Sequence, residues 1–167
     1  MANKVLDNIF ARKSVRKFTT EKVSMEDIET LLKAAMAAPT AKNSQPWRFV
    51  VIENRETLDR LDARLPYARL ATAPIAIAVC GDTTGYSRFW EQDCAAATEN
   101  ILLATESIGL GCCWTAASDD ERSSVVREIL ELPENVHPFC VIPVGHPDGE
   151  FAAKDKWKPE FIHYEKW

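Results

Sequence analysis

A group of basic residues lies close to the N-terminus of this 167-residue chain. In the stretch ARKSVRKFTT, at 11–20, four basic side chains fall within six positions, namely Arg12, Lys13, Arg16 and Lys17. If the stretch is an extended turn, Arg12, Ser14 and Arg16 project to one side and offer guanidinium groups and a hydroxyl to one anion. A phosphate suits that set of donors. An ordinary solvated turn after an amphipathic helix would have the same composition, so both interpretations stay open.

The chain as a whole carries the opposite charge. Its formal net charge is −5, with 25 acidic residues against 20 lysines and arginines. A nucleic-acid-binding protein usually presents a broad basic face, and this composition argues against one. A local basic group in an acidic chain indicates a small anionic ligand instead.

A second polar stretch, TAKNSQPW at 40–47, has side chains suited to a planar ligand. The amides of Asn43 and Gln45 can both donate and accept hydrogen bonds, which suits the edge of a heterocycle. Pro46 and Trp47 would stiffen the loop where it enters a strand. Surface loops are also commonly rich in Asn, Ser and Gln, so this stretch alone does not decide between the two interpretations.

Motifs of other enzyme classes are incomplete. Gly109 and Gly111 begin a dinucleotide-type pattern, but Trp114 stands where the third glycine belongs. The chain lacks a phosphate-loop motif and a G-x-S-x-G elbow. His137 and Cys140 could start a zinc site, but too few further ligands exist, so no metal is expected.

The five cysteines form no spaced framework: Cys80, Cys94, Cys112, Cys113 and Cys140. Adjacent Cys112 and Cys113 could act as a redox pair. Strand alternation favours a different arrangement, in which one side chain faces the core and the other faces a pocket. The N-terminus lacks the apolar core of a signal peptide and no run is long enough to span a membrane, so a reducing cytoplasm is expected.

The hydrophobic periodicity predicts helices and strands in mixed order. Helices are expected over 3–11, from Ser24 to before Pro39, around Leu58 and Leu61, over 89–108, and after a Ser118 cap with Glu121 completing a capping box. Strands are expected over 48–53, 73–82, 112–116 and 138–145. This order predicts one domain, 1–167, with an α+β or α/β sheet covered by helices.

Four stretches, in this order and spacing, resemble the FMN-dependent nitroreductase family. They are RKSVRKF at 12–18, APTAKNSQPWRFVVI at 38–52, QDCAAATENILLATESIGLGCCW at 92–114 and HYEKW at 163–167. The resemblance implies an α+β fold with a mostly antiparallel sheet flanked by helices, in an intertwined homodimer with FMN at the interface. It also implies a ping-pong transfer of electrons from NADH or NADPH through the flavin to nitroaromatics or quinones.

The resemblance also assigns roles to residues. Arg12 and Ser14 would hold the FMN phosphate, and the basic pair Lys154 and Lys156 would complete that site. Lys13 would lie along the ribityl chain and phosphate, and Arg16 would approach the N1/O2 edge of the ring. Five residues would come from the partner subunit: Pro39, Thr40, Ala41, Asn43 and Gln45. A backbone segment would pass near the flavin N5 at Gly111, Cys112 and Trp114.

No dedicated catalytic side chain is expected, because the flavin carries the electron chemistry and the protein binds, orients and tunes it. Other functions stay open: a flavin reductase, a biosynthetic flavin oxidoreductase, or a flavin-binding module without turnover. A thiol-redox protein that uses Cys112 and Cys113 is a further alternative. The expected partners are a second copy of the chain and a small aromatic or quinone-like substrate.

Overall fold

The protein is described by a computed structural model that covers residues 3–65, 67–86 and 88–167. Its helices are α1 (Lys4–Ala11), α2 (Met25–Met36), α3 (Arg55–Arg64), α4 (Trp90–Ser107) and α5 (Asp120–Leu130), with short 3-10 turns η1 (Ala41–Asn43) and η2 (Pro159–Phe161). Its strands are β1 (Trp47–Ile52), β2 (Ile75–Asp82), β3 (Gly111–Cys112), β4 (Thr115–Ala116) and β5 (Val136–Gly145). Five helices and four strand regions were expected, and all are present.

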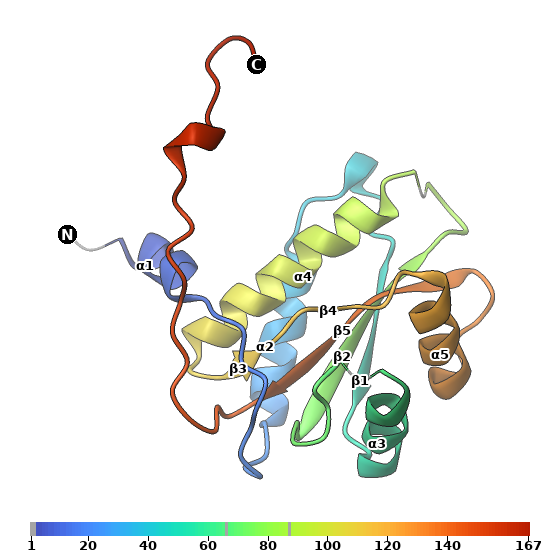
Figure 1. The fold of residues 1–167 in the computed structure, drawn as a ribbon. Coiled ribbons are helices and arrows are strands. Elements are labelled where there is room, and N and C mark those ends of the chain that lie inside the picture. The colour runs from blue at the N-terminus through green and yellow to red at the C-terminus, as the bar shows by residue number, and fades with distance from the viewer. Residues whose placement is uncertain (1–2, 66, 87) are drawn as a thin grey trace.

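The strands form one antiparallel sheet in the order β1-β2-β5-β3, with β4 also paired to β5 (Figure 1). The two central strands β2 and β5 are almost entirely buried, which explains their nearly continuous apolar sequences. The predicted α+β class with an antiparallel sheet between helices is confirmed.

Side chains alternate across the sheet and divide the core into two layers. The side of β2 that carries Ile75, Ile77 and Val79 packs in one cluster with residues of α2 and α4. The opposite side, which carries Ala76, Ala78 and Cys80, packs in a second cluster with residues of α3 and α5. The period of two along a strand thus places one pair of helices on each face (Figure 1).

Helix caps confirm one prediction and correct another. Ser24 caps α2 as predicted: its Oγ accepts from the backbone N–H of Asp27 at 3.0 Å. Helix α5, however, is capped by Asp119 rather than by Ser118, because the Asp119 carboxylate accepts from the N–H of Arg122 at 3.0 Å. A carboxylate is as good a cap as a hydroxyl, and its charge also suits the positive end of a helix.

The predicted strand over 112–116 is two shorter strands. In β3, Cys112 pairs with Val144, and in β4, Thr115 pairs with Val141, so the register continues across the gap. Pro143 lies across from Cys113 in that register and has no backbone N–H to donate. The interruption leaves the side chain of the intervening Trp114 partly exposed.

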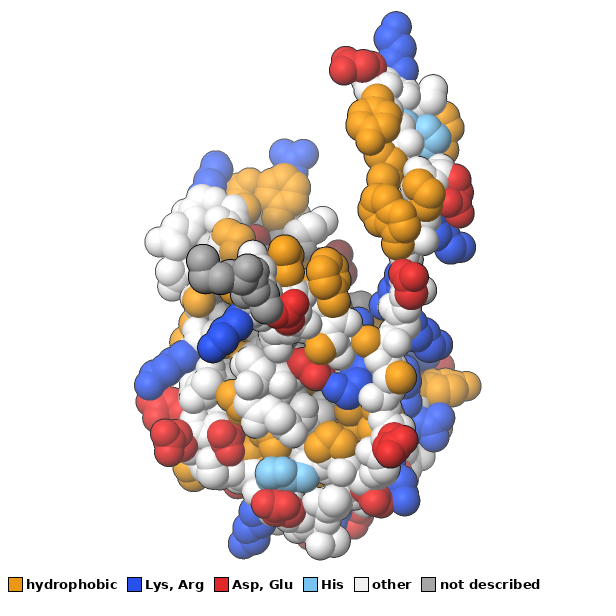
Figure 2. Space-filling model, turned by 90° about the vertical axis from the view of Figure 1, so that its left-hand side faces the viewer, with side chains coloured by type: hydrophobic (Ala, Val, Ile, Leu, Met, Phe, Trp, Pro, Cys, Tyr) orange, Lys and Arg blue, Asp and Glu red, His pale blue; other side chains and the backbone are white. Residues whose placement is uncertain are grey.

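Two segments at the ends of the chain stand away from this core. Helix α1 buries none of its residues, and four apolar side chains on it are exposed: Val5, Leu6, Ile9 and Phe10. Beyond β5 the C-terminal segment begins at Phe151, which packs against the buried Val15 and Phe18, and it then projects from the body with exposed aromatic residues, among them Trp157, Phe161, Tyr164 and Trp167 (Figures 1 and 2). Within the described residues, no helix is long and apolar enough to cross a membrane.

A substitution at Gly111 tests the packing beside β3. A Cβ at this position would lie 2.7 Å from the Cβ of Val15, which is fixed by the backbone and cannot move aside. Replacing Gly111→Ala should therefore lower the free energy of unfolding by roughly 1–3 kcal/mol, measured by urea denaturation. Gly85→Ala is the matched control, since a Cβ there would meet no described atom within 4 Å. Equal effects of both changes would contradict this account.

Candidate functional site

The basic stretch forms an extended segment at the edge of the sheet. The N–H of Val15 donates to the carbonyl of Cys112 in β3 at 2.8 Å, and the N–H of Thr19 donates to the carbonyl of His146 at 2.9 Å. The side chains of Val15 and Phe18 are buried. With Val15 pointing inward, its neighbours Ser14 and Arg16 are left on the other side, as predicted for an extended turn.

The first cavity, which we call the basic cavity, has a volume of about 230 Å³. Its lining residues are Arg12, Lys13, Ser14, Arg16, Ala152, Lys154 and Lys156. Five of these seven residues are lysine or arginine and none is acidic, so the cavity suits an anion. The fold thus brings the predicted N-terminal group together with the predicted C-terminal pair, although some 140 residues separate them in sequence.

Two carboxylates of helix α4 lie next to this cavity. The Lys13 ammonium pairs with Glu106 at 2.7 Å, and both side chains are mostly buried. The guanidinium of Arg12 lies 4.0 Å from Glu99, at the limit of an ion pair. Lys13 is therefore largely neutralised and held toward α4, whereas Arg12 keeps most of its capacity to bind an anion.

The second cavity, which we call the arginine cavity, has a volume of about 290 Å³. It is lined by Arg16, Tyr67, Arg69, Cys113, Trp114, Thr115, Ala116 and Arg122. Arg16 lines both cavities, so the two adjoin. The indole of Trp114 packs edge-on against Phe139, with 5.5 Å between the ring centroids. Of the predicted residues, Arg16 and Trp114 meet here.

The arginine cavity also holds one aromatic and two basic side chains that the sequence did not predict, namely Tyr67, Arg69 and Arg122. Arg69 has a left-handed backbone (φ 58°) in the loop before β2. That loop is held in place because Arg55 donates to two of its carbonyls and Asp62 accepts from the N–H of Leu70 at 2.7 Å. Isolated residues in unrelated segments leave no periodic signal, so only the folded chain could identify them.

The loop at 39–45 has a strained backbone. Lys42, Asn43 and Gln45 all have positive φ values, of 54°, 53° and 46°. This conformation is costly for residues with side chains and persists only where surrounding contacts enforce it. Such strain often occurs at binding sites, and it lies here in the stretch predicted to contact a planar ligand.

A buried carboxylate enforces that conformation. Asp93, in the first turn of α4, accepts from the N–H of Ala41 at 3.0 Å and from the hydroxyl of Ser44 at 3.4 Å. It is only 6% exposed and makes both contacts to the loop. Asp93 therefore positions the predicted residues Thr40, Ala41 and Asn43, a role that no sequence pattern indicated.

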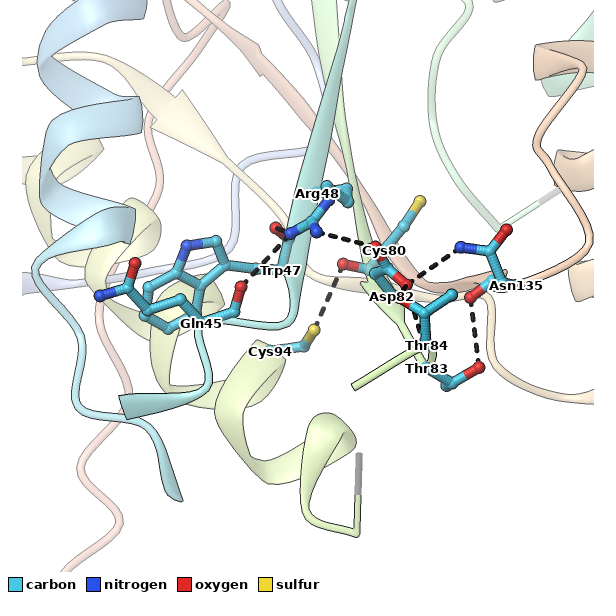
Figure 3. A network of polar contacts seen from close by, with 9 residues as sticks. All are labelled: Gln45, Trp47, Arg48, Cys80, Asp82, Thr83, Thr84, Cys94 and Asn135. Carbon is cyan, nitrogen blue, oxygen red and sulfur yellow. Dashed lines mark hydrogen bonds and ion pairs between the residues drawn. The ribbon is translucent and has the colours of Figure 1, made fainter. Parts of the chain in front are cut away.

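A second polar network fixes the other end of the loop (Figure 3). Arg48 donates to the carbonyls of Gln45 at 3.3 Å and Trp47 at 2.8 Å, and pairs with Asp82 at 2.7 Å. Asp82 also accepts from Thr84 and Asn135. The hydrogen bond from the Thr84 hydroxyl, more than any other contact, lowers the pKa of Asp82, which keeps the carboxylate charged as an anchor for Arg48.

The loop and the basic cavity lie at opposite ends of helix α4. Asp93 holds the loop at the N-terminal end, and Glu106 holds Lys13 at the C-terminal end. Glu106 follows Asp93 by thirteen positions, which corresponds to roughly 20 Å of helix axis. One chain therefore brings together the predicted residues at 12–16, Lys154 and Lys156, but keeps the group at 39–45 apart from them.

The remaining predicted residues lie beneath the cavities. Gly111 is buried against Val15, and Cys112 belongs to the core cluster shared with α2 and α4. Burial raises the pKa of Cys112 to about 12, so this thiol is inert at neutral pH. Cys113 instead lines the arginine cavity. One cysteine in the core and one at a pocket is the arrangement that strand alternation favoured.

Comparison with known proteins identifies the family. The Nitroreductase family model matches residues 9–66 and 62–146. A protein of Methanothermobacter thermautotrophicus, provisionally named NADH dehydrogenase/NAD(P)H nitroreductase, is 42% identical over 98% of this chain and 87% of its own. The crystal structure of a protein with the same provisional name from Bacteroides thetaiotaomicron superposes with a TM-score of 0.97, at 48% identity over 100% of both chains.

A third relative holds the cofactor in its structure. The nitroreductase with bound FMN from Bacteroides fragilis has a TM-score of 0.81 at 25% identity, over 99% of this chain and 100% of that one. The relatives confirm the resemblance that the four sequence stretches indicated. By its family match, its sequence identity over nearly the full length and its fold, the chain belongs to the nitroreductase family of NAD(P)H-dependent flavin oxidoreductases.

Proposed function

We propose that this chain is an FMN-dependent oxidoreductase that transfers electrons from NADH or NADPH to small electron-poor acceptors such as nitroaromatics and quinones. In this proposal, the chain acts as one flavin-binding domain within a homodimer and the reaction is ping-pong. The observation that carries it is the pair of adjoining cavities that share Arg16, one rich in phosphate-binding groups and the other lined by aromatic and guanidinium groups.

The donor groups of the basic cavity fit the phosphate of FMN. Arg12 offers a guanidinium fork and Ser14 a hydroxyl, and Lys154 and Lys156 add positive charge. Lys13 is held by Glu106, so its part is to shape the cavity beside the ribityl chain. The absence of any acidic residue from the described lining makes the site selective for an anion.

Arg16 and Arg69 would serve the edge of the flavin ring. Both line the arginine cavity and a smaller adjoining one, so their guanidinium groups serve the same region. The bound flavin would supply two-electron transfer between donor and acceptor. Cations at the ring edge favour the electron-rich form of the cofactor, because they stabilise the negative charge that accumulates there.

The unpartnered apolar surfaces support a homodimer. Val5 and Phe10 on α1 are 68% and 70% exposed, and Trp157 and Tyr164 on the C-terminal segment are 72% and 83% exposed. Figure 2 shows hydrophobic side chains gathered along this projecting segment. Exposed apolar surface of this kind is typical of a subunit interface. A second copy would cover it.

The separation along α4 supports a site shared between subunits. Asp93, which holds the strained loop at 39–45, and Glu106, which holds Lys13 of the basic cavity, lie roughly 20 Å apart along the axis of this helix. In a two-fold dimer, the loop of one subunit can approach the cavity of the other. Pro39, Thr40, Ala41, Asn43 and Gln45 would then complete the partner's flavin site.

Arg12→Ala tests the basic cavity. The variant should fold normally but bind FMN roughly 10–100-fold more weakly, because it loses a charge-assisted contact to phosphate. Titration of the flavin-stripped protein with FMN, followed by fluorescence quenching, measures the affinity. Lys33→Ala is the matched control, since it removes one positive charge from an exposed ion pair with Glu29 on α2. If both variants bind FMN like the wild type, the phosphate site is wrongly placed.

Mixed dimers test the shared site. Asp93→Ala should release the loop and Arg12→Ala should weaken the phosphate site, so either homodimer should retain little flavin. When both variants are co-expressed with different tags, the mixed dimer should recover close to half of the wild-type flavin content. One of its two sites would receive both defects, and the other would receive none.

The opposite result has a clear meaning. If loop and cavity served the same flavin within one subunit, every site of the mixed dimer would carry one defect and no flavin would return. Asp93→Asn is the control for the loop, because its amide oxygen can still accept from the N–H of Ala41. This variant should retain more flavin than Asp93→Ala.

A further inference from the structure

The arginine cavity holds more positive charge than the flavin edge requires. Three guanidinium groups line it, from the basic segment (Arg16), the loop before β2 (Arg69) and the first turn of α5 (Arg122). The proposed function uses Arg16 and Arg69 at the ring edge. Arg122 is therefore a third cation without an assigned partner in the reaction.

Contacts at the start of α5 hold Arg122 in place. Its Nη1 donates to Asp119 Oδ2 at 2.8 Å, and its backbone N–H donates to the same carboxylate. Its guanidinium carbon lies 5.8 Å from the centroid of the Tyr67 ring. Among the described residues, Nε and Nη2 of Arg122 have no hydrogen-bond partner, so the guanidinium keeps donors for a ligand.

Acidic residues only partly offset this charge. Asp119 pairs with Arg122 from outside the cavity lining, and Asp62 lines the smaller neighbouring cavity with Arg16 and Arg69. The described lining of the arginine cavity itself contains no acidic side chain. Its net charge is therefore positive, as a site for an anion requires.

The same cavity offers flat apolar surface. Tyr67 is 66% exposed and Trp114 is 36% exposed, and both line it together with the guanidinium groups. A volume of about 290 Å³ suits a small aromatic molecule and is too small for a whole dinucleotide. Aromatic surface and guanidinium groups together favour a planar ligand with an anionic substituent.

We infer that the arginine cavity, through Arg122, recognises an oxyanion on one of the molecules that react at the flavin. The anion is a carboxylate or sulfonate of an aromatic acceptor, or a phosphate of NADPH. This inference rests on the proposed function and extends it to the class of substrate. Arg122 binds the anion with the donors that Asp119 leaves free, and Tyr67 and Trp114 contact the ring or chain that bears it.

Matched substrates separate the two sources of the anion. The acceptor pair is the carboxylate of (4-nitrophenyl)acetic acid and its neutral amide, in which a methylene insulates the nitro group from the charge. The donor pair is NADPH and NADH. For each pair we compare the ratio of kcat/KM values: carboxylate over amide for the acceptors (the acceptor ratio) and NADPH over NADH for the donors (the donor ratio). In a ping-pong reaction, kcat/KM for each substrate reports its own half-reaction, so the two ratios are independent. Both are measured anaerobically with FMN-loaded wild type, Arg122→Gln and Arg122→Lys.

We expect the wild type to prefer the more anionic member of one substrate pair. In Arg122→Gln this preference should fall roughly 10–100-fold, because a charge-assisted contact is lost. In Arg122→Lys the preference should fall less, because lysine keeps the positive charge. A falling acceptor ratio identifies an anionic acceptor, and a falling donor ratio identifies the NADPH phosphate. Arg64→Gln is the control, since it removes a cation from the exposed pair with Glu128 and should change neither ratio.

Two outcomes would overturn the inference. One is that both ratios stay unchanged in Arg122→Gln although FMN is bound normally. The other is that Arg122→Gln loses FMN itself, which would make Arg122 a flavin ligand. Neither outcome resembles failure of the proposed function, in which FMN-loaded wild type would accept electrons from neither NADH nor NADPH.

Discussion

Helix α4 sets the distance between the two halves of the candidate site. The helix is buried against the sheet, so its ends cannot shift independently. The mostly buried carboxylate of Asp93 at one end orders the 39–45 loop, and that of Glu106 at the other end holds Lys13 beside the basic cavity. A buried carboxylate must keep its hydrogen-bond donors, since leaving it without them is costly. This requirement makes each half of the site rigid.

The fold concentrates positive charge that the sequence distributes among distant segments. The two adjoining cavities receive cations from four segments: residues 12–16, the loop before β2, helix α5 and the C-terminal segment. Like charges at this density repel one another, and a bound anion relieves that repulsion. Such a ligand stabilises the folded chain by mass action. A protein of negative net charge thus has a strongly basic site.

Local sequence rules predicted most of the elements and the side to which the basic segment projects, and the roles assigned to the site residues stay predictions. Short-range patterns predicted the Ser24 cap and the long α4 helix. They also predicted that Ser14 and Arg16 project to the same side of the extended segment. Two predictions were wrong: Asp119 rather than Ser118 caps α5, and the strand over 112–116 is interrupted opposite Pro143. In the first case a neighbouring carboxylate replaced the predicted cap, and in the second a distant proline lacks the N–H that a continuous ladder needs. Periodicity detects neither effect.

The sequence alone determined the family, the antiparallel sheet between helices and the basic segment that suits a phosphate, because each depends on neighbouring residues or on motifs in a recognisable order. Only the tertiary structure showed that Tyr67, Arg69 and Arg122 share a cavity with Arg16, and that Asp93 holds the 39–45 loop. These contacts join residues many positions apart. Their existence depends on how the helices pack on the sheet, which no local pattern records.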